Sequence, residues 1–149
     1  MGSAGKIWLA DPDNPVESSF TAASGDHTLL AFSADGSRLA DANSNGAINL
    51  WQSKDGSLSQ PIQFQKPEAL SLAFSQNGKR LAIGTARNVF LVDTSNGSEI
   101  ARIPVSDIVN DISFTHDGRL LTVASSNLIQ TWELESMQPI DDLLQAACQ

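Results

Sequence analysis

The sequence predicts an all-β fold of repeated four-stranded antiparallel sheets, because three separate patterns recur at one period. A ten-residue segment occurs three times, as AFSADGSRLA, AFSQNGKRLA and SFTHDGRLLT at residues 31–40, 73–82 and 113–122. A short apolar segment recurs in step with it, as IWLA, INLW, VFLV and IQTW. Gly56 and Ile62 recur as Gly97 and Ile103. A repeat of about 40–45 residues with short strands and Gly turns is typical of the blades of a β-propeller.

The segment from Ala69 to Val105 shows how one repeat forms one sheet. Residues 69–74 are mostly apolar, as expected of a strand that is covered on both faces. A turn at residues 75–78 ends in Gly, which supplies the positive φ that a tight hairpin needs. Residues 80–85 and 88–93 predict the second and third strands. Gly97 interrupts the chain, and residues 99–105 predict the fourth strand.

Applied to the whole chain, the period predicts a single partial propeller over residues 1–149, with about three and a half blades. Its parts are the last two strands of a broken blade at 5–22, three blades at 27–64, 69–105 and 109–140, and a short C-terminal helical tail at 141–149. Because residues 3–7 align with residues 44–48, the chain starts inside a blade. We therefore expect a fragment of a larger protein, formed by truncation or as one half of a split propeller.

An open stack of blades leaves a face uncovered at each end. Such faces are expected to be apolar, so a second copy of the chain or the missing blades of the same propeller would cover them. Between blades, both faces of each sheet are packed, which predicts a structural core that includes Phe32, Trp51, Phe74, Phe90, Phe114 and Trp132. The alternative for these aromatic residues is stacking against a ligand.

Composition restricts the class of partner. The formal net charge is −8, which argues against binding nucleic acid through its phosphates. The sequence has no long apolar run, so we expect no membrane span. The single cysteine, Cys148, cannot form an internal disulfide, and this favours a reducing, cytoplasmic location.

No residue pattern indicates catalysis, a cofactor or a metal. Asp11 and Asp13 have the spacing of a calcium loop, but Val16 and Ala22 stand where such a loop has Gly and Glu. The alternative is a propeller enzyme or small-ligand binder of the hydrolase type, with carboxylates in its central channel. Asp41 and Asp111 are the candidates, and Asp111 is the better one because the first strand of each blade lines the channel.

The repeats resemble WD40-repeat β-propellers. That family's blade contains Phe-Ser-Pro-Asp-Gly, then Leu-Ala-Ser-Gly-Ser, then Leu-Trp-Asp. Segments 32–36, 74–78 and 114–118 match the first motif, 39–43, 81–85 and 121–125 the second, and 50–52, 91–93 and 131–133 the third. The family's Gly-His pair and its buried turn Asp are absent, so we expect the polar network around the Trp to be missing and stability to depend on apolar packing. The C-terminal tail resembles bacterial, notably cyanobacterial, multidomain WD40 proteins.

The resemblance implies a non-catalytic scaffold for protein–protein interaction within a signalling or regulatory protein. It places docking on the loops before the inner strands and on the turns between the second and third strands. Glu68, Arg87 and Asp107 are our candidates for protein-binding residues there. A third hypothesis is an engineered piece made to study how propellers assemble.

Overall fold

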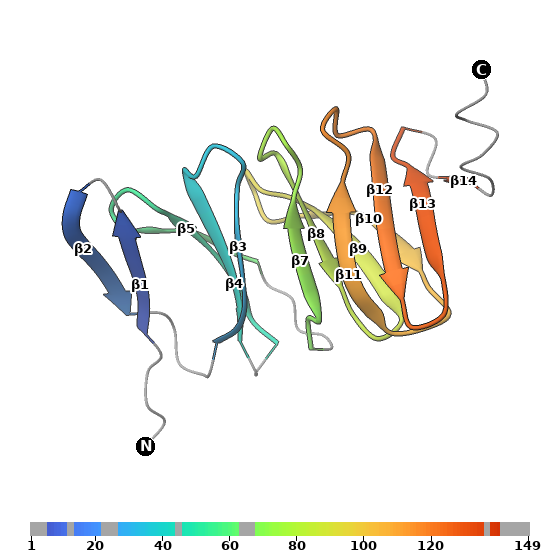
Figure 1. The fold of residues 1–149 in the computed structure, drawn as a ribbon, viewed down its shortest axis with the longest axis horizontal. Coiled ribbons are helices and arrows are strands. Elements are labelled where there is room, and N and C mark those ends of the chain that lie inside the picture. Colours follow the sequence, from blue (N-terminus) through green and yellow to red (C-terminus); the bar gives the residue numbers. More distant parts are fainter. Residues whose placement is uncertain are drawn as a thin grey trace.

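Four antiparallel sheets stand side by side in a computed structural model of the chain (Figure 1). The structure describes residues 6–11, 14–21, 27–43, 46–62, 68–135 and 138–140. No helix occurs in these residues, so none there could span a membrane. The helix predicted at 141–149 lies outside the described residues. The all-β partial propeller predicted from the repeats is confirmed by the sheets.

Each of the three larger sheets is formed by four strands that follow one another in the chain. The first sheet has two strands, β1 (Lys6–Asp11) and β2 (Asn14–Thr21). The second sheet comprises β3 (His27–Phe32), β4 (Arg38–Asn43), β5 (Ile48–Gln52) and β6 (Leu58–Ile62). The third sheet comprises β7 (Ser71–Phe74), β8 (Arg80–Gly84), β9 (Asn88–Asp93) and β10 (Glu99–Pro104). The fourth sheet comprises β11 (Val109–Phe114), β12 (Leu120–Ser125), β13 (Ile129–Glu133) and β14 (Gln138–Ile140).

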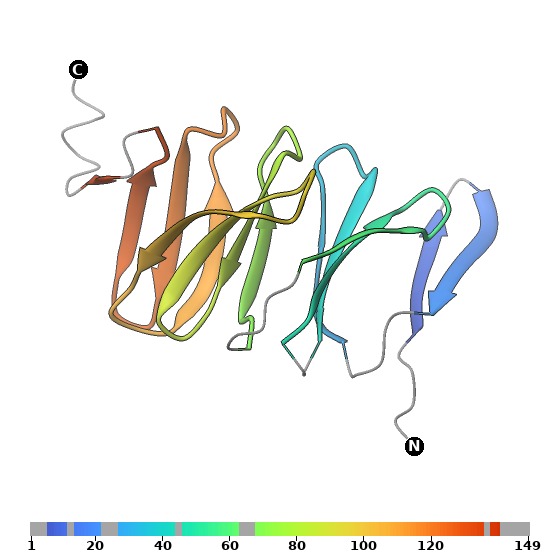
Figure 2. The same cartoon turned by 180° about the vertical axis from the view of Figure 1, so that it is seen from behind.

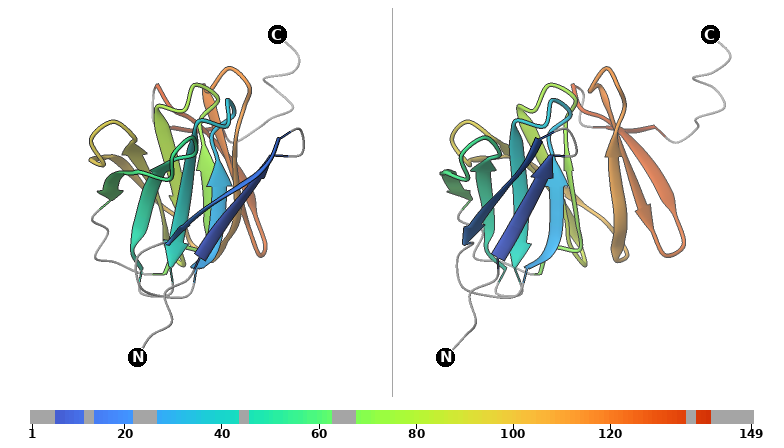
Figure 3. Two further views of the ribbon diagram at one scale, coloured as in Figure 1. Left: turned by 90° about the vertical axis from the view of Figure 1, so that its left-hand side faces the viewer. Right: turned by 60° about the vertical axis from the view of Figure 1, so that its left-hand side comes forward.

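The inner strands β3, β7 and β11 lie next to one another, so the sheets are stacked in the manner of propeller blades. Figures 2 and 3 show that the stack is an open row, with the first sheet at one end and the fourth at the other. Pro104 is tolerated in β10 because that strand is at the edge of its sheet, where a missing N–H breaks no ladder.

The third sheet is covered on both faces, which explains its nearly continuous apolar strands. Leu81, Phe90 and Val92 pack with residues of the second sheet, and Val89 and Leu91 pack with residues of the fourth. Phe90 is 1% exposed. Trp51 is also buried, whereas Phe74, Phe114 and Trp132 are partly buried.

Phe32 was expected in the core, but its side chain is 53% exposed. Leu30, two residues earlier on the same face of β3, is also exposed. Their equivalents Leu72 and Phe74 on β7 pack against the second sheet. The first sheet has only two strands, and Leu30 and Phe32 therefore lack the cover that the equivalent side chains of β7 receive.

The far face of the fourth sheet differs from the apolar end face that the sequence predicted. Thr122 and Thr131 lie on it, with their hydroxyl oxygens 3.2 Å apart in a hydrogen bond. In the third sheet, the equivalent residues are Ala82 and Leu91, which are buried against the fourth sheet. Ile129, 68% exposed, lies on the same face, which therefore carries both polar and apolar side chains.

Candidate binding surfaces at the two ends of the sheets

The connections between strands form two opposite surfaces. The turn end contains the turns that follow β3, β7 and β11, at residues 33–37, 75–79 and 115–119, and these lie at the top of Figure 1. The loop end contains the turns before β9 and β13 and the segment before β11, at residues 85–87, 126–128 and 105–108. The sequence placed the docking residues at the loop end.

One pattern of hydrogen bonds builds each of these three turns at the turn end. The Ser33 hydroxyl donates to Asp35 Oδ1 over 2.7 Å, and the Ser37 amide donates to the same oxygen over 3.0 Å. Asn77 accepts equivalent bonds in the second turn, and Asp117 accepts them in the third. Gly36 closes its turn at a φ of 70°, a conformation that favours glycine. The repeated Ser/Thr-x-Asp/Asn-Gly sequence therefore fixes the shape of this surface.

These hydrogen bonds stabilise the ionised carboxylates. The hydrogen bonds from Ser33 and Ser37 lower the pKa of Asp35 to about 2. Bonds from Thr115 and the Arg119 amide lower the pKa of Asp117 in the same way. Both side chains are therefore ionised at neutral pH and occupied within their own turns.

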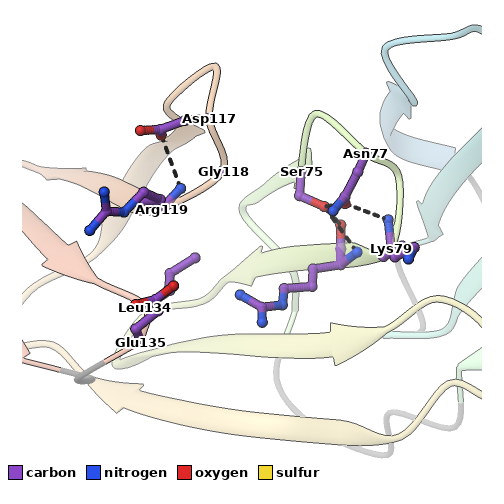
Figure 4. A pocket seen from close by; sticks show the side chains of 9 residues that line it. Ser75, Asn77, Lys79, Asp117, Gly118, Arg119, Leu134 and Glu135 are labelled. Carbon is purple, nitrogen blue, oxygen red and sulfur yellow. Dashed lines mark hydrogen bonds between the residues drawn. The ribbon is translucent and has the colours of Figure 1, made fainter.

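A pocket of about 250 Å³ opens at the turn end between the third and fourth sheets (Figure 4). The Asn77 and Asp117 turns face each other across it, with Leu134 and Glu135 beside them. Three basic residues line it, namely Lys79, Arg80 and Arg119. We call this the Arg80 pocket. In a chain of net charge −8, such a concentration of cations is distinctive.

An equivalent pocket of about 200 Å³ lies between the second and third sheets. It is lined by Arg38, by Lys79 and by the Asp35 and Gly78 turns, and we call it the Arg38 pocket. The Arg38 guanidinium donates to the Thr94 hydroxyl over 2.8 Å, and that hydroxyl donates to the Gly78 carbonyl over 2.6 Å. Arg38 is thus held by a residue of the neighbouring sheet.

The Arg80 pocket lacks this internal partner, because Leu134 occupies the place of Thr94. The backbone amides of the two residues make equivalent bonds, from Thr94 to the Lys79 carbonyl and from Leu134 to the Arg119 carbonyl. An isobutyl side chain cannot accept a hydrogen bond. Among the described residues, the half-buried Arg80 guanidinium makes neither a hydrogen bond nor an ion pair.

At the loop end, the structure brings together two of the three predicted docking residues. The Val105 amide donates to the Arg87 carbonyl over 3.0 Å, which ties the turn before β9 to the segment that contains Asp107. Asn127, from the turn before β13, donates to Asp107 over 3.3 Å. Arg87 is exposed, Asp107 is half-buried, and Glu68 is exposed just before β7. Protein binding at these three residues stays a prediction.

The structure does not place Asp41 on a central channel. Asp41 is 0% exposed, and it accepts hydrogen bonds from Trp51 Nε1 and from Asn49. Asp111 lies on the inner strand β11 and is exposed, and one of its oxygens accepts from the Ile112 amide. Within the described residues, no group of three His, Cys, Asp or Glu side chains could hold a metal ion.

The expectation that no polar network surrounds the tryptophans is wrong for the second sheet, where Asp41 bonds to Trp51. Asp41 stands where the family motif has the Ser of Leu-Ala-Ser, and this was the signal that sequence reasoning missed. The expectation holds for the fourth sheet. Val123 occupies the equivalent place there, and Trp132 Nε1 has no hydrogen-bond partner among the described residues.

Solved structures that resemble this chain are β-propellers or parts of larger chains. The chain superposes on U3-55K with a TM-score of 0.72 at 19% identity, over 80% of this chain and 39% of that one. It superposes on the β-propeller domain of Swd1 from Myceliophteria thermophila with a TM-score of 0.69 at 17% identity, over 80% and 39% of the two chains. A hydrazine synthase chain from Kuenenia stuttgartiensis gives 0.66 at 22% identity, over 74% and 33%. The chain therefore has the fold of part of a β-propeller.

Sequence relatives then point to WD-repeat proteins. The chain is 30% identical to an intraflagellar transport protein 122 homolog of Danio rerio over 71% of its length, but it spans only 9% of that relative. It is 31% identical to WD repeat-containing protein SL1-17 of Schistosoma mansoni, over 68% of this chain and 34% of the relative. It is 29% identical to pre-mRNA-processing factor 19 of Dictyostelium discoideum, over 75% and 23%. No family model matches. Fold and similarities together support a WD-repeat β-propeller.

Proposed function

We propose that the chain is a non-catalytic protein-interaction segment of a longer WD-repeat propeller protein. The similarity to WD-repeat relatives carries the proposal of a protein-interaction role. The proposal of a longer protein rests on coverage, because the chain spans about a tenth of the first of these relatives. The geometry supports it with stacked sheets whose connecting turns and loops form two opposite surfaces. Loops held on a rigid scaffold are where binding residues are concentrated.

The finer parts of the proposal rest on the sequence. Docking at Glu68, Arg87 and Asp107, a signalling or regulatory role, a cytoplasmic location and a bacterial multidomain context are proposals. The relatives reported above are an animal transport protein, a fluke protein and a slime-mould protein, and they give no support to the bacterial context. Pairing of two copies through open blade faces is also part of the proposal. Leu30 and Phe32 support it as exposed apolar side chains on the second sheet, where the two-stranded first sheet leaves them uncovered.

The test is site-specific photo-crosslinking in the cell. A photoreactive amino acid is placed at Arg87, at Asp107 or, as the control, at Arg102 on the edge strand β10, which is also exposed. We expect the first two positions, and not Arg102, to give crosslinks to one defined protein. Crosslinks that do not differ between the loop end and Arg102 would reject docking at the loop end.

The alternative of a propeller enzyme is favoured by one observation, the exposed carboxylate of Asp111 on an inner strand. Metal analysis of the purified chain and of the Asp111→Ala variant decides this alternative. A metal that is bound by the chain and lost in the variant would favour the enzyme.

A further inference from the structure

The Arg80 pocket contains an unsatisfied cation at a place where the equivalent arginine of the previous sheet is satisfied. Arg38 and Arg80 both begin the second strand of their sheets and both line a pocket at the turn end. Arg38 donates to Thr94, whereas Arg80 faces Leu134. A half-buried guanidinium has lost part of its hydration, and its donors are most stable when an acceptor replaces the lost water.

The charges around Arg80 point to an anionic acceptor. In the Arg38 pocket, the turn preceding the arginine contributes Asp35 and Ser37, so this wall carries one anion beside Arg38. In the Arg80 pocket, the equivalent positions are Asn77 and Lys79, so this wall carries two cations and no anion.

The opposite wall does not remove this excess. Arg119 adds a third cation, and Glu133 lies 3.6 Å from it in an exposed ion pair. Asp117 accepts its hydrogen bonds within its own turn. Asp93 is an electrostatic partner of both Arg38 and Arg80, and its carboxylate accepts hydrogen bonds from Ser95. Glu135 is the exposed anion that competes for the pocket.

We propose that the Arg80 pocket binds a carboxylate group of an acidic segment from a partner protein. The guanidinium of Arg80 would receive the two carboxylate oxygens, since its planar fork matches a carboxylate. Lys79 and Arg119 would attract the acidic segment to the pocket. Among the residues that line the pocket, the three cations exceed Asp117 and Glu135 by one charge, which suits one carboxylate better than a phosphate dianion. This inference rests on the proposed protein-binding function, and it adds a second contact at the turn end.

The test is titration of a blocked hexaglutamate peptide into the full chain, followed by calorimetry at low and high salt. We expect binding that weakens with salt. Arg80→Gln is expected to weaken binding by about tenfold or more, because it removes a charge-assisted hydrogen bond. Arg102→Gln is the matched control and is expected to leave binding unchanged, since Arg102 is exposed at β10 and pairs with Glu99 at 3.0 Å. Equal affinity of the parent chain and the Arg80→Gln variant would overturn the proposal.

Two further variants, at the equivalent positions 134 and 94, test the role of the hydroxyl group without removing a charge. Leu134→Thr supplies the hydroxyl that holds Arg38 in the other pocket, so it is expected to capture Arg80 and weaken peptide binding. Thr94→Val removes the hydroxyl acceptor of Arg38, so it is expected to create a second, weaker peptide site. Thermal unfolding of each variant shows whether it folds. Folded variants with unchanged affinity and stoichiometry would contradict the assignment.

Inorganic phosphate is the second probe, because a phosphate would use the same donors. Tighter binding of phosphate than of the peptide at Arg80 would overturn the assignment to a carboxylate. The crosslinking experiment at the loop end gives an independent result. Peptide binding at Arg80 without crosslinks at Arg87 or Asp107 would reject docking at the loop end and leave this site supported. Crosslinks without an effect of Arg80→Gln on peptide binding would reject this site alone.

Discussion

The Trp51 indole donates its Nε1–H to the Asp41 carboxyl group on the neighbouring strand, and both residues are buried. In the fourth sheet, Val123 stands at the position equivalent to Asp41, and the Trp132 indole N–H has no hydrogen-bond partner among the described residues. One residue on the second strand of a sheet thus decides whether the indole N–H of the tryptophan on the third strand has an acceptor.

Asp41→Ala is expected to destabilise the fold by about 1–3 kcal/mol, because it leaves the Trp51 indole and the Asn49 amide without their acceptor. Chemical denaturation of the variant measures this loss. Trp51→Phe and the double variant complete a cycle. If the single losses simply add up, the two side chains are not energetically coupled.

Val123→Thr is expected to give Trp132 the acceptor that it lacks, because threonine has nearly the shape of valine and adds a hydroxyl group. The stability gain from the new bond is about 1 kcal/mol, which offsets the cost of burying a hydroxyl group. Val89→Thr is the matched control, because Val89 is buried in the same cluster. A loss of stability at Val123 as large as at Val89 would show that no such bond forms.

Gly84→Ala is expected to destabilise the contact between the third and fourth sheets. A Cβ at Gly84 would clash with Ser71 Oγ on the neighbouring strand β7, and it would lie 2.5 Å from Val109 Cγ1 and 3.0 Å from Val109 Cβ across the sheet contact. Between the second and third sheets, Ala42 and Ala69 occupy the equivalent positions. Relative to that pair, the larger Val109 is accompanied by the smaller Gly84. Overpacking of this kind costs about 1–3 kcal/mol. In the double variant with Val109→Ala, part of the stability lost in Gly84→Ala should be regained, and thermal unfolding measures this. Stability losses of the two single variants that simply add up would contradict direct contact between the two residues.

Acid should weaken the turn end over a defined range of pH. The pKa of Asp35 falls from 3.8 to about 2 because of its hydrogen bonds from Ser33 and Ser37. A lowered pKa in the folded state stabilises the fold above the unfolded value, and this stabilisation is lost as pH falls from about 4 toward 2.

Asp35→Asn keeps an acceptor oxygen, as Asn77 does in the next turn, but removes the titration. It should therefore reduce the dependence of the free energy of unfolding on pH below about 4. Asn77→Asp is the reciprocal variant and should increase that dependence. Denaturation at several pH values measures both effects. If the free energy of unfolding depends on pH in the same way in the parent chain and in both variants, the assigned cause is contradicted.

Most of the architecture could be predicted from the sequence, because each sheet is formed by neighbouring segments of the chain. The Gly turns at Gly36, Gly78 and Gly118 and the apolar third strands fix four-stranded antiparallel units at one period. The residues of the Arg80 pocket are separated by more than one repeat, so no local pattern joined Arg80 to Leu134. Arg38, Arg80 and Arg119 each follow a Gly turn in the sequence, but the sequence does not show which residue of the neighbouring sheet each arginine meets.

By itself, the sequence determined the repeat, the strands and the turns, because hydrogen bonding and apolar alternation within one sheet depend on residues close in the chain. Only the tertiary structure decided which side chains are satisfied across two sheets. The stacking places Thr94 against Arg38 and Leu134 beside Arg80, and it leaves Phe32 exposed where Phe74 is covered. These differences arise because the contacts between sheets depend on the identity of residues about one repeat apart, which the period leaves free to vary.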